Sequence, residues 1–331
     1  MSKHYPGARE PAIADLSLTV GAGEVCVLVG PSGSGKTTAL RLINRLIKLS
    51  SGDILLGGDS VLARKEVELR RDIGYVIQQV GLFPHLNVGE NIATVPRLLG
   101  WDKQRISGRV HELMGMIGLD ADEMAGRYPA QLSGGQRQRV GVARALAADP
   151  PLMLMDEPFG AIDPINRARL QDEFLGLQRQ VRKTVVFVTH DIDEAIKMGD
   201  RIAILREGGV LAQYDTPSEI LTHPADEFVA QFVGADRALK RLSLTTLAEL
   251  PLLAPDGADG TAHSASASPA DRPRLPRETT VHDALSQLLG AGGEPLQVTD
   301  GDGRVLGLVT LAQVQQLLNA DGAPATLEKA S

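Results

Sequence analysis

Residues 30–38 have the types and spacing of a loop that binds phosphate groups. Their sequence, GPSGSGKTT, matches the pattern G-x-x-x-x-G-K-[ST] and lies between an apolar run and a helical pattern. Glycines let the backbone turn tightly, so that successive N–H groups at the start of a helix can point at phosphate oxygens. We expect the Lys36 side chain to neutralise the β- and γ-phosphates of a nucleotide and the Thr37 hydroxyl to bind Mg²⁺. The predicted nucleotide-binding residues of this loop are Gly30, Pro31, Ser32, Gly33, Ser34, Gly35, Lys36, Thr37 and Thr38.

Two adjacent carboxylates follow a second apolar run. Asp156 and Glu157 end the strand-like segment PLMLMDEP, and parallel sheets place ligand-binding groups at the carboxyl ends of their strands. We expect Asp156 to hold Mg²⁺ through its water shell and Glu157 to polarise the water that attacks the γ-phosphate. Paired acids also occur in ordinary solvated loops, so this assignment depends on the phosphate-binding loop.

The elements that position these residues are typical of an α/β domain. Apolar five-residue runs followed by helical patterns recur from residue 20 to about residue 210, which indicates a largely parallel sheet. Between about residues 87 and 149 the pattern is helical without strands, which predicts a helical subdomain. Gly208 and Gly209 predict a hairpin turn, and a closing helix follows it. The first domain is therefore expected to span residues 1–240.

The remaining chain is expected to carry a small second module. Residues 251–277 are rich in Ala, Pro, Ser, Gly and Asp, and we expect a linker over residues 241–277. Residues 278–320 predict the order helix, strand, strand, helix. Residues 321–331 are expected to form a disordered tail.

Composition excludes several classes of protein. The net charge of −7 and the lack of a clustered basic face argue against a nucleic-acid partner. The longest apolar stretches contain about five residues, whereas a helix that crosses a bilayer needs roughly 20. The N-terminus lacks an apolar signal core and Cys26 is the single cysteine, so we expect a cytosolic protein without an intrachain disulfide.

The segment LSGGQ at residues 132–136 completes a motif set that resembles that of the ABC ATPases. Asp163 in the turn GAID and His190 after TVVFVT follow in the order expected for that family. The resemblance implies a P-loop NTPase fold with a helical subdomain, ATP and Mg²⁺ as cofactors, and a head-to-tail homodimer. In such a dimer, the phosphate-binding loop of one chain and the LSGGQ of the other hold ATP. The additional nucleotide-binding residues that it implies are Ser133, Gly134, Gly135, Gln136 and Asp163.

The resemblance implies roles for three further residues. His190 would contact the γ-phosphate, and Gln78 would coordinate the metal or the attacking water and sense a membrane partner, with Gln79 as the less favoured choice. Tyr5 resembles the aromatic residue that stacks on adenine. An isolated His, Gln or Tyr at such positions can be purely structural, so these assignments depend on the whole motif set.

Longer segments are similar to the osmoprotectant import ATPases of this family. They are INRLI at 43–47, the stretch at 68–101, RYPAQLSGGQ at 127–136 and DEPFGAIDPINR at 156–167. The resemblance implies ATP-driven import of quaternary amines, namely glycine betaine, choline and carnitine, with proline as a further candidate. It also implies integral-membrane permease subunits, an extracytoplasmic substrate-binding protein and a peripheral location on the cytoplasmic face of the cell membrane. The segment GLFPHLNVGEN resembles the surface by which importer ATPases receive a permease.

Three other interpretations stay open at this point. The chain can be an importer ATPase for another small solute such as an amino acid, a soluble ABC ATPase that acts on ribosomes or DNA, or a non-catalytic scaffold. The soluble class usually has two ATPase units or long coiled coils, which this sequence lacks. Retention of Glu157 and His190 argues against a scaffold.

Two departures from the family pattern bear on the ends of the chain. Family members usually have a first strand before the SKxY segment, whereas Ser2 directly follows Met1. Either an edge strand is missing or the start of the sequence was assigned late, and in both cases we expect Tyr5 to be less well anchored. The C-terminal module resembles a single CBS repeat instead of the usual tandem pair. Sensing of adenine nucleotide or ionic strength is one hypothesis for this module, and a vestigial dimerising appendage is the other.

Overall fold

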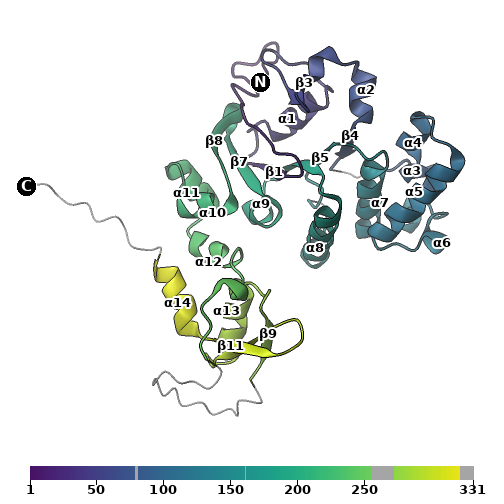
Figure 1. Cartoon of the computed structure of the whole chain (residues 1–331). Coiled ribbons are helices and arrows are strands. Elements are labelled where there is room, and N and C mark those ends of the chain that lie inside the picture. Colours follow the sequence, from purple (N-terminus) through teal and green to yellow (C-terminus); the bar gives the residue numbers. More distant parts are fainter. Residues whose placement is uncertain (79–80, 161, 255–271, 321–331) are drawn as a thin grey trace, which may run out of the picture. The chain divides into compact units, whose positions relative to one another are not determined.

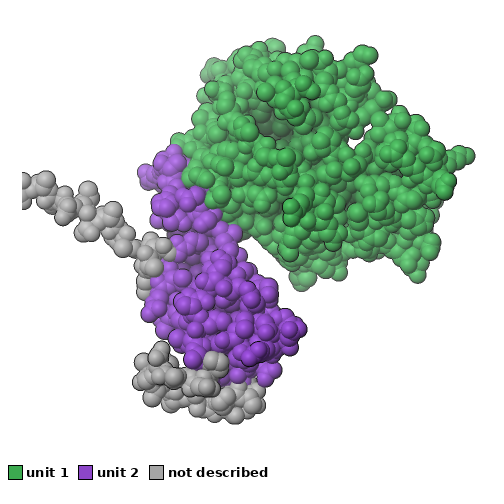
Figure 2. Space-filling view, in the orientation of Figure 1, with its two compact units in different colours: residues 1–217 green, residues 218–331 purple. Residues whose placement is uncertain are grey.

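The computed structural model describes the chain except for residues 79–80, 161, 255–271 and 321–331. The chain divides into two compact units, residues 1–217 and residues 218–331 (Figure 2). The first unit contains the phosphate-binding loop and all the other predicted site residues. The expected disordered tail, together with most of the segment rich in Ala, Pro and Ser, lies outside the described residues.

A six-stranded sheet forms the centre of the first unit (Figure 1). Five neighbouring strands are parallel and the last pairs antiparallel at one edge. Two of these strands, Val25–Val29 before the phosphate-binding loop and Leu152–Asp156 at the acid pair, are buried at every residue. Their sequences are therefore almost continuously apolar. In spatial order the strands are β4 (Ile73–Val76), β5 (Leu152–Asp156), β6 (Thr184–Val188), β1 (Val25–Val29), β7 (Arg201–Arg206) and β8 (Val210–Asp215).

The register of the sheet aligns the carboxyl ends of three neighbouring strands. Val188 at the end of β6 pairs with Leu28 of β1 on one side and with Asp156 of β5 on the other. The chain therefore leaves β1, β5 and β6 at the same edge, where parallel sheets place their ligand-binding loops.

Helices and short elements complete this unit. Gly208 and Gly209 have φ angles of 75° and 67° between β7 and β8, which confirms the predicted hairpin turn. The helices beside the sheet are α1 (Lys36–Ile43), α2 (Glu66–Arg71), α8 (Pro164–Val181) and α9 (Ile192–Met198). The short elements are β2 (Leu55–Leu56), β3 (Asp59–Ser60), η1 (Val61–Ala63) and η3 (Glu207–Gly209).

Between β4 and β5 the described residues contain helices and no strand. The helix α7, which follows the LSGGQ segment, packs against α3 and α5 and also against β4. It thereby joins this helical region to the sheet. The helices are α3 (Val88–Ile92), α4 (Thr94–Leu98), α5 (Lys103–Met116), α6 (Ala121–Met124), η2 (Pro129–Gln131) and α7 (Gly134–Leu146).

The second unit builds its own core around a three-stranded sheet in the order β11-β10-β9. The predicted order helix, strand, strand, helix is confirmed, and β9 adds a strand parallel to β10. Leu242, Leu247 and Leu275 are buried in this core, so both ends of the expected linker belong to the module. The elements are α10 (Pro217–Thr222), α11 (Glu227–Val233), α12 (Arg237–Leu242), η4 (Leu247–Glu249), β9 (Arg274–Pro276), α13 (Val281–Gly290), β10 (Leu296–Thr299), β11 (Val305–Val309) and α14 (Leu311–Ala320).

None of the helices formed by the described residues combines the length and apolar character needed to cross a membrane.

Candidate nucleotide-binding site

The loop between β1 and α1 has a backbone that only glycine tolerates at two positions. Gly30 and Gly35 have φ angles of 155° and 79°. A Cβ atom on Gly30 would lie 2.2 Å from the carbonyl oxygen of Leu205, and one on Gly35 would lie 2.4 Å from that of Ala12. Gly33 has a φ angle of 83°, but no heavy atom lies within 4 Å of its ideal Cβ position. The loop therefore packs against Leu205 at Gly30 and against Ala12 at Gly35, and it is open at Gly33.

A cavity of about 370 Å³ lies over this loop and the start of α1. Its presence at a helix N-terminus, beside a lysine, fits the phosphate groups of a nucleotide. Ala12 is a lining residue that no sequence motif signals, because residues 11–13 reach the loop only through the fold. The lining residues are Ala12, Ser32, Gly33, Gly35, Lys36, Thr37, Thr38 and Glu157.

The other predicted loop residues support Lys36 instead of lining the cavity. The Lys36 ammonium donates to the carbonyl oxygens of Gly30 and Pro31 at 2.7 and 2.9 Å and to the buried Ser34 hydroxyl at 3.2 Å. Burial lowers the pKa of Lys36, while the negative charges of Glu157 and Asp156 act in the opposite direction. A bound phosphate would add the negative charge that favours the ammonium form.

Two oxygen-bearing side chains meet beside the loop. The Thr37 hydroxyl donates to Asp156 Oδ1 at 2.9 Å, which brings together two of the three predicted Mg²⁺ ligands. Burial raises the pKa of Asp156, the Thr37 hydrogen bond opposes this, and the charge of Glu157 adds to it. A buried carboxylate next to a hydroxyl suits a hard cation that prefers oxygen ligands. Among the residues that the structure describes, no group of three or more His, Cys, Asp or Glu side chains could hold a metal ion.

Two candidate catalytic residues, Gln78 and His190, contact the third, Glu157, which lines the cavity. Glu157 accepts a hydrogen bond from Gln78 Nε2 at 2.9 Å through Oε2, and His190 Nδ1 lies 3.3 Å from its Oε1. These residues follow the neighbouring strands β4, β5 and β6, whose ends the parallel register aligns. Gln79, the less favoured choice beside Gln78, lies outside the described residues.

Glu157 has a strained backbone that its sequence does not signal. Its φ angle is 44°, a left-handed conformation that costs a non-glycine residue about 1–3 kcal/mol. Its N–H donates to the carbonyl oxygen of Val188 at 2.9 Å, which ties the residue to the end of β6. This bond holds the carboxylate close to His190, two residues after Val188.

The LSGGQ residues lie away from the cavity of their own chain. Ser133 caps α7, since its hydroxyl accepts from the Gln136 N–H at 3.2 Å while Gln136 Oε1 accepts from the Ser133 N–H at 2.9 Å. Ser133 and Gly134 are exposed, and Gly135 is half-buried. None of residues 133–136 is among the described residues that line the 370 Å³ cavity.

Asp163 and Tyr5 also lie outside the cavity lining. Asp163 is exposed and caps α8, where the side-chain amide of Asn166, 2.8 Å away, is the largest of the influences that lower its pKa. Tyr5 is 38% exposed, with the Lys3 ammonium 4.8 Å from its ring centroid. A bridge between Lys3 and Ile13 attaches this segment to the first unit. The structure therefore does not bring Tyr5 or Asp163 to the described wall of the cavity.

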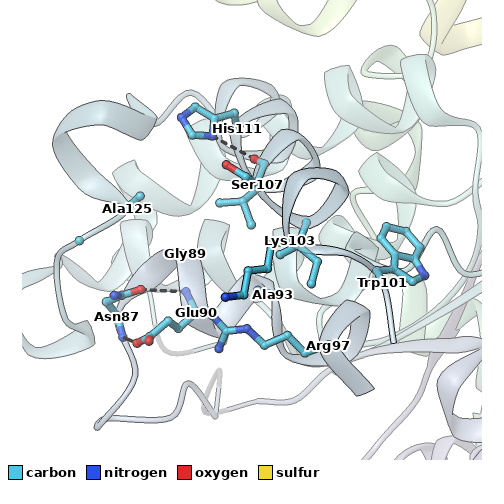
Figure 3. Close-up of a pocket in the computed structure, with 13 residues that line it drawn as sticks. Asn87, Gly89, Glu90, Ala93, Arg97, Trp101, Lys103, Ser107, His111 and Ala125 are labelled. Atoms are coloured by element: carbon cyan, nitrogen blue, oxygen red, sulfur yellow. Dashed lines mark hydrogen bonds between the residues drawn. The ribbon is translucent and has the colours of Figure 1, made fainter. Parts of the chain in front are cut away.

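A second cavity of about 720 Å³ lies in the helical region (Figure 3). Basic side chains from α4 and α5, Arg97 and Lys103, line it together with Trp101 and Glu90. Glu90 forms a capping box with Asn87 at the start of α3.

The segment before α3 is fixed by one buried side chain. Asn91 Oδ1 accepts from the Phe83 N–H at 2.8 Å, and its amide group donates to the carbonyl oxygens of Phe83, Leu86 and Asn87. Arg144 of α7 also donates to the Gly81 carbonyl oxygen at 2.6 Å. Gly81, Phe83, Leu86 and Asn87 are thus held by side chains of α3 and α7.

Comparisons with known proteins identify the relatives of this chain. A family model described as ABC transporter matches residues 13–160. The chain is 49% identical over 311 residues to the osmoprotectant import ATP-binding protein OsmV of Salmonella typhimurium, a match that covers 94% of the chain and 76% of the relative. It is 52% identical over 240 residues to the glycine betaine/carnitine/choline transport ATP-binding protein OpuCA of Bacillus subtilis, a match that covers 72% of the chain and 62% of the relative.

Among solved structures, the chain is similar to the dimeric ATP-binding cassette MJ0796 in a post-hydrolysis state bound to ADP and Pi. The identity is 35%, the TM-score is 0.57, and the match covers 65% of this chain and 96% of that one.

Proposed function

The chain belongs to the ATP-binding proteins of ABC transporters, and we propose that it powers the import of quaternary-amine osmoprotectants through partner membrane subunits. ATP binding and hydrolysis follow from family membership. The proposed cargo is glycine betaine, choline and carnitine, with proline as a further candidate, because the similar proteins from Salmonella and Bacillus are named for osmoprotectant, glycine betaine, carnitine and choline transport.

The convergence of Gln78 and His190 on Glu157 is the observation that carries the proposed chemistry. In this proposal the Lys36 ammonium and the N-terminus of α1 bind the phosphates of ATP, and the Glu157 carboxylate accepts a proton from the attacking water. Gln78 and His190 orient that carboxylate and the γ-phosphate. Thr37 and Asp156, with Gln78 as a further candidate, would hold Mg²⁺, which supplies positive charge to the phosphate oxygens when bound.

The position of the LSGGQ residues supports a homodimer. Ser133 and Gly134 are exposed at the N-terminus of a 13-residue helix, and they do not line the described wall of their own chain's cavity. A helix N-terminus favours an anion, so we propose that this one closes on the nucleotide of a second copy. Asp163 would lie at the same interface, and Tyr5 would stack on adenine.

The second cavity supports a permease contact. Its lining joins Trp101 with Arg97, Lys103 and Glu90. Asn91 and Arg144 hold Phe83 and Gly81, which precede it in the chain. We propose that a cytoplasmic segment of an integral-membrane permease binds there, which would place the chain peripherally on the cytoplasmic face of the cell membrane. An extracytoplasmic substrate-binding protein would select the cargo.

Uptake of labelled glycine betaine at high osmolarity tests the proposed cargo. Cells carrying the wild-type chain are compared with cells carrying Glu157→Gln, and choline, carnitine, proline and an unrelated amino acid are added as competitors. We expect the variant to abolish uptake and the quaternary amines to compete best. Uptake that is indifferent to Glu157→Gln would overturn the cargo and leave the ATPase in place.

A further inference from the structure

A buried carboxylate outside the cavity lies between the two loops that carry His190 and Asp163. Glu194 is in the first turn of α9, and its exposed fraction is 7%. Buried carboxylates are uncommon unless their oxygens are satisfied by specific partners. The neighbours of the Glu194 carboxylate come from the loop before α9 and from α8.

The loop before α9 supplies the first partner. The hydroxyl of Thr189, which is 2% exposed and directly precedes His190, faces the Glu194 carboxylate and acts to lower its pKa. The Thr189 oxygen also accepts from the N–H of Asp191 at 3.1 Å. The Thr189 hydroxyl therefore joins the two residues that flank His190, and the N–H of Glu194 donates to Asp191 Oδ1 at 3.3 Å.

The helix α8 supplies the second group of partners. Gln171, which is 7% exposed, donates from Nε2 to Glu194 Oε1 at 2.9 Å. Arg167 lies one turn earlier on the same face of α8. Burial raises the pKa of the Glu194 carboxyl, and the positive charge of Arg167 lowers it because it favours the ionised form. Arg167 also donates from Nη2 to the Ile162 carbonyl oxygen at 3.1 Å, and its N–H donates to the Asp163 carbonyl oxygen at 2.8 Å.

We propose that Glu194 is a positioning residue that holds the His190 loop and the Asp163 turn in one fixed arrangement. On one side Glu194 is bonded to Asp191 and faces the Thr189 hydroxyl. On the other side its carboxylate accepts from Gln171 of α8, the helix whose Arg167 donates to residues 162 and 163. Glu194 touches neither the cavity nor the reacting groups, so it acts through His190 and Asp163. The inference rests on ATP hydrolysis by this chain and not on the proposed cargo or membrane partner.

Steady-state ATP hydrolysis by the full chain with Mg²⁺-ATP tests this role. We expect Glu194→Gln to lower kcat at least about threefold while KM for ATP stays within about twofold, because the phosphate-binding loop is unchanged. The matched control is Asp172→Asn, which removes an exposed ion pair with Lys197 between the same two helices. It is expected to leave kcat and KM unchanged.

Thermal unfolding of each variant separates positioning from loss of the fold. If Glu194→Gln does not fold, Thr189→Val tests the proposal in its place, because it removes one hydroxyl at nearly constant volume. We expect Thr189→Val to lower kcat at least about threefold with the same KM. A kcat closer to wild type, or a loss that is expressed in KM, would overturn the proposal. Failure of glycine betaine uptake would not bear on this result, because no cargo or permease enters the assay.

Discussion

The side-chain amide of Gln78 donates to the carboxylate of Glu157 over 2.9 Å, although the two residues are 79 positions apart. Gln78 follows β4 and Glu157 follows β5, and these strands are neighbours in the sheet. The pairing of β4 with β5 therefore brings Gln78 to the proposed catalytic base.

Replacement of Glu157 by Gln tests the assignment of this base. We expect turnover to fall about 100-fold or more because the amide cannot accept a proton from water, while ATP binding persists and a stable dimer accumulates. Hydrolysis assays, nucleotide binding and size-exclusion chromatography measure the three properties. Glu68→Gln, at an exposed ion pair with Lys65, is the control and should leave all three unchanged. Retained hydrolysis in Glu157→Gln would show that another group is the base.

Replacement of Lys36 by Ala tests the phosphate contact. Its ammonium is the cation that lines the described cavity, and a charge-assisted hydrogen bond contributes about 1.5–3 kcal/mol. We therefore expect Kd for ATP to rise about tenfold or more, measured by titration with a fluorescent nucleotide. Lys65→Ala, at an 85% exposed side chain, is the matched control. Equal affinities of the two variants would contradict the assignment.

Two glycine substitutions separate backbone strain from steric overlap in the phosphate-binding loop. Gly33→Ala would introduce strain alone, whereas Gly35→Ala would also place a Cβ atom 2.4 Å from the Ala12 carbonyl oxygen. We expect Gly35→Ala to lower the free energy of unfolding by about 1–3 kcal/mol more than Gly33→Ala does. Urea denaturation of both variants measures this difference, and a larger loss in Gly33→Ala would contradict it.

The pH dependence of stability tests the buried state of Asp156. Burial raises the pKa of Asp156 in the folded chain above its unfolded-state value, near 3.8. Protonation of Asp156 therefore stabilises the fold, fully below pH 3.8, and this contribution is lost as pH rises through the folded-state pKa. Without nucleotide, Asp156→Asn should therefore unfold at a higher temperature than wild type at neutral pH. The difference should shrink as pH falls toward 3.8. Thermal unfolding across this range, with the exposed Asp172→Asn as control, measures it; a difference that grows toward acid pH would refute the assignment.

Removal of residues 236–331 tests the sensing hypothesis for the C-terminal module. We expect this truncation to change how glycine betaine uptake depends on osmolarity. A cut after residue 250 would leave Leu242 and Leu247 without the rest of their core, so the earlier cut is the cleaner one. Unchanged osmotic dependence, with normal thermal unfolding of the truncated chain, would favour the vestigial appendage.

The sequence by itself determined the parts of this protein that depend on local pattern. Apolar runs of five residues identified the buried strands, and Gly208 and Gly209 identified the hairpin turn. The residues of the phosphate-binding loop are contiguous, so their spacing alone indicated phosphate binding. Gln78 and His190 could be assigned only through resemblance to a family, because a single residue carries no spacing.

Only the tertiary structure decided which distant residues meet. The left-handed backbone of Glu157, the approach of Ala12 to Gly35 and the Glu194–Gln171 bond each depend on the alignment of strand ends or helix faces far apart in sequence. Leu247 and Leu275 are buried in one core, so the ends of the expected linker belong to the C-terminal module. Composition does not reveal this, because it does not show which apolar residues pack against one another. Local pattern reports what a residue prefers, whereas packing and register fix what it contacts.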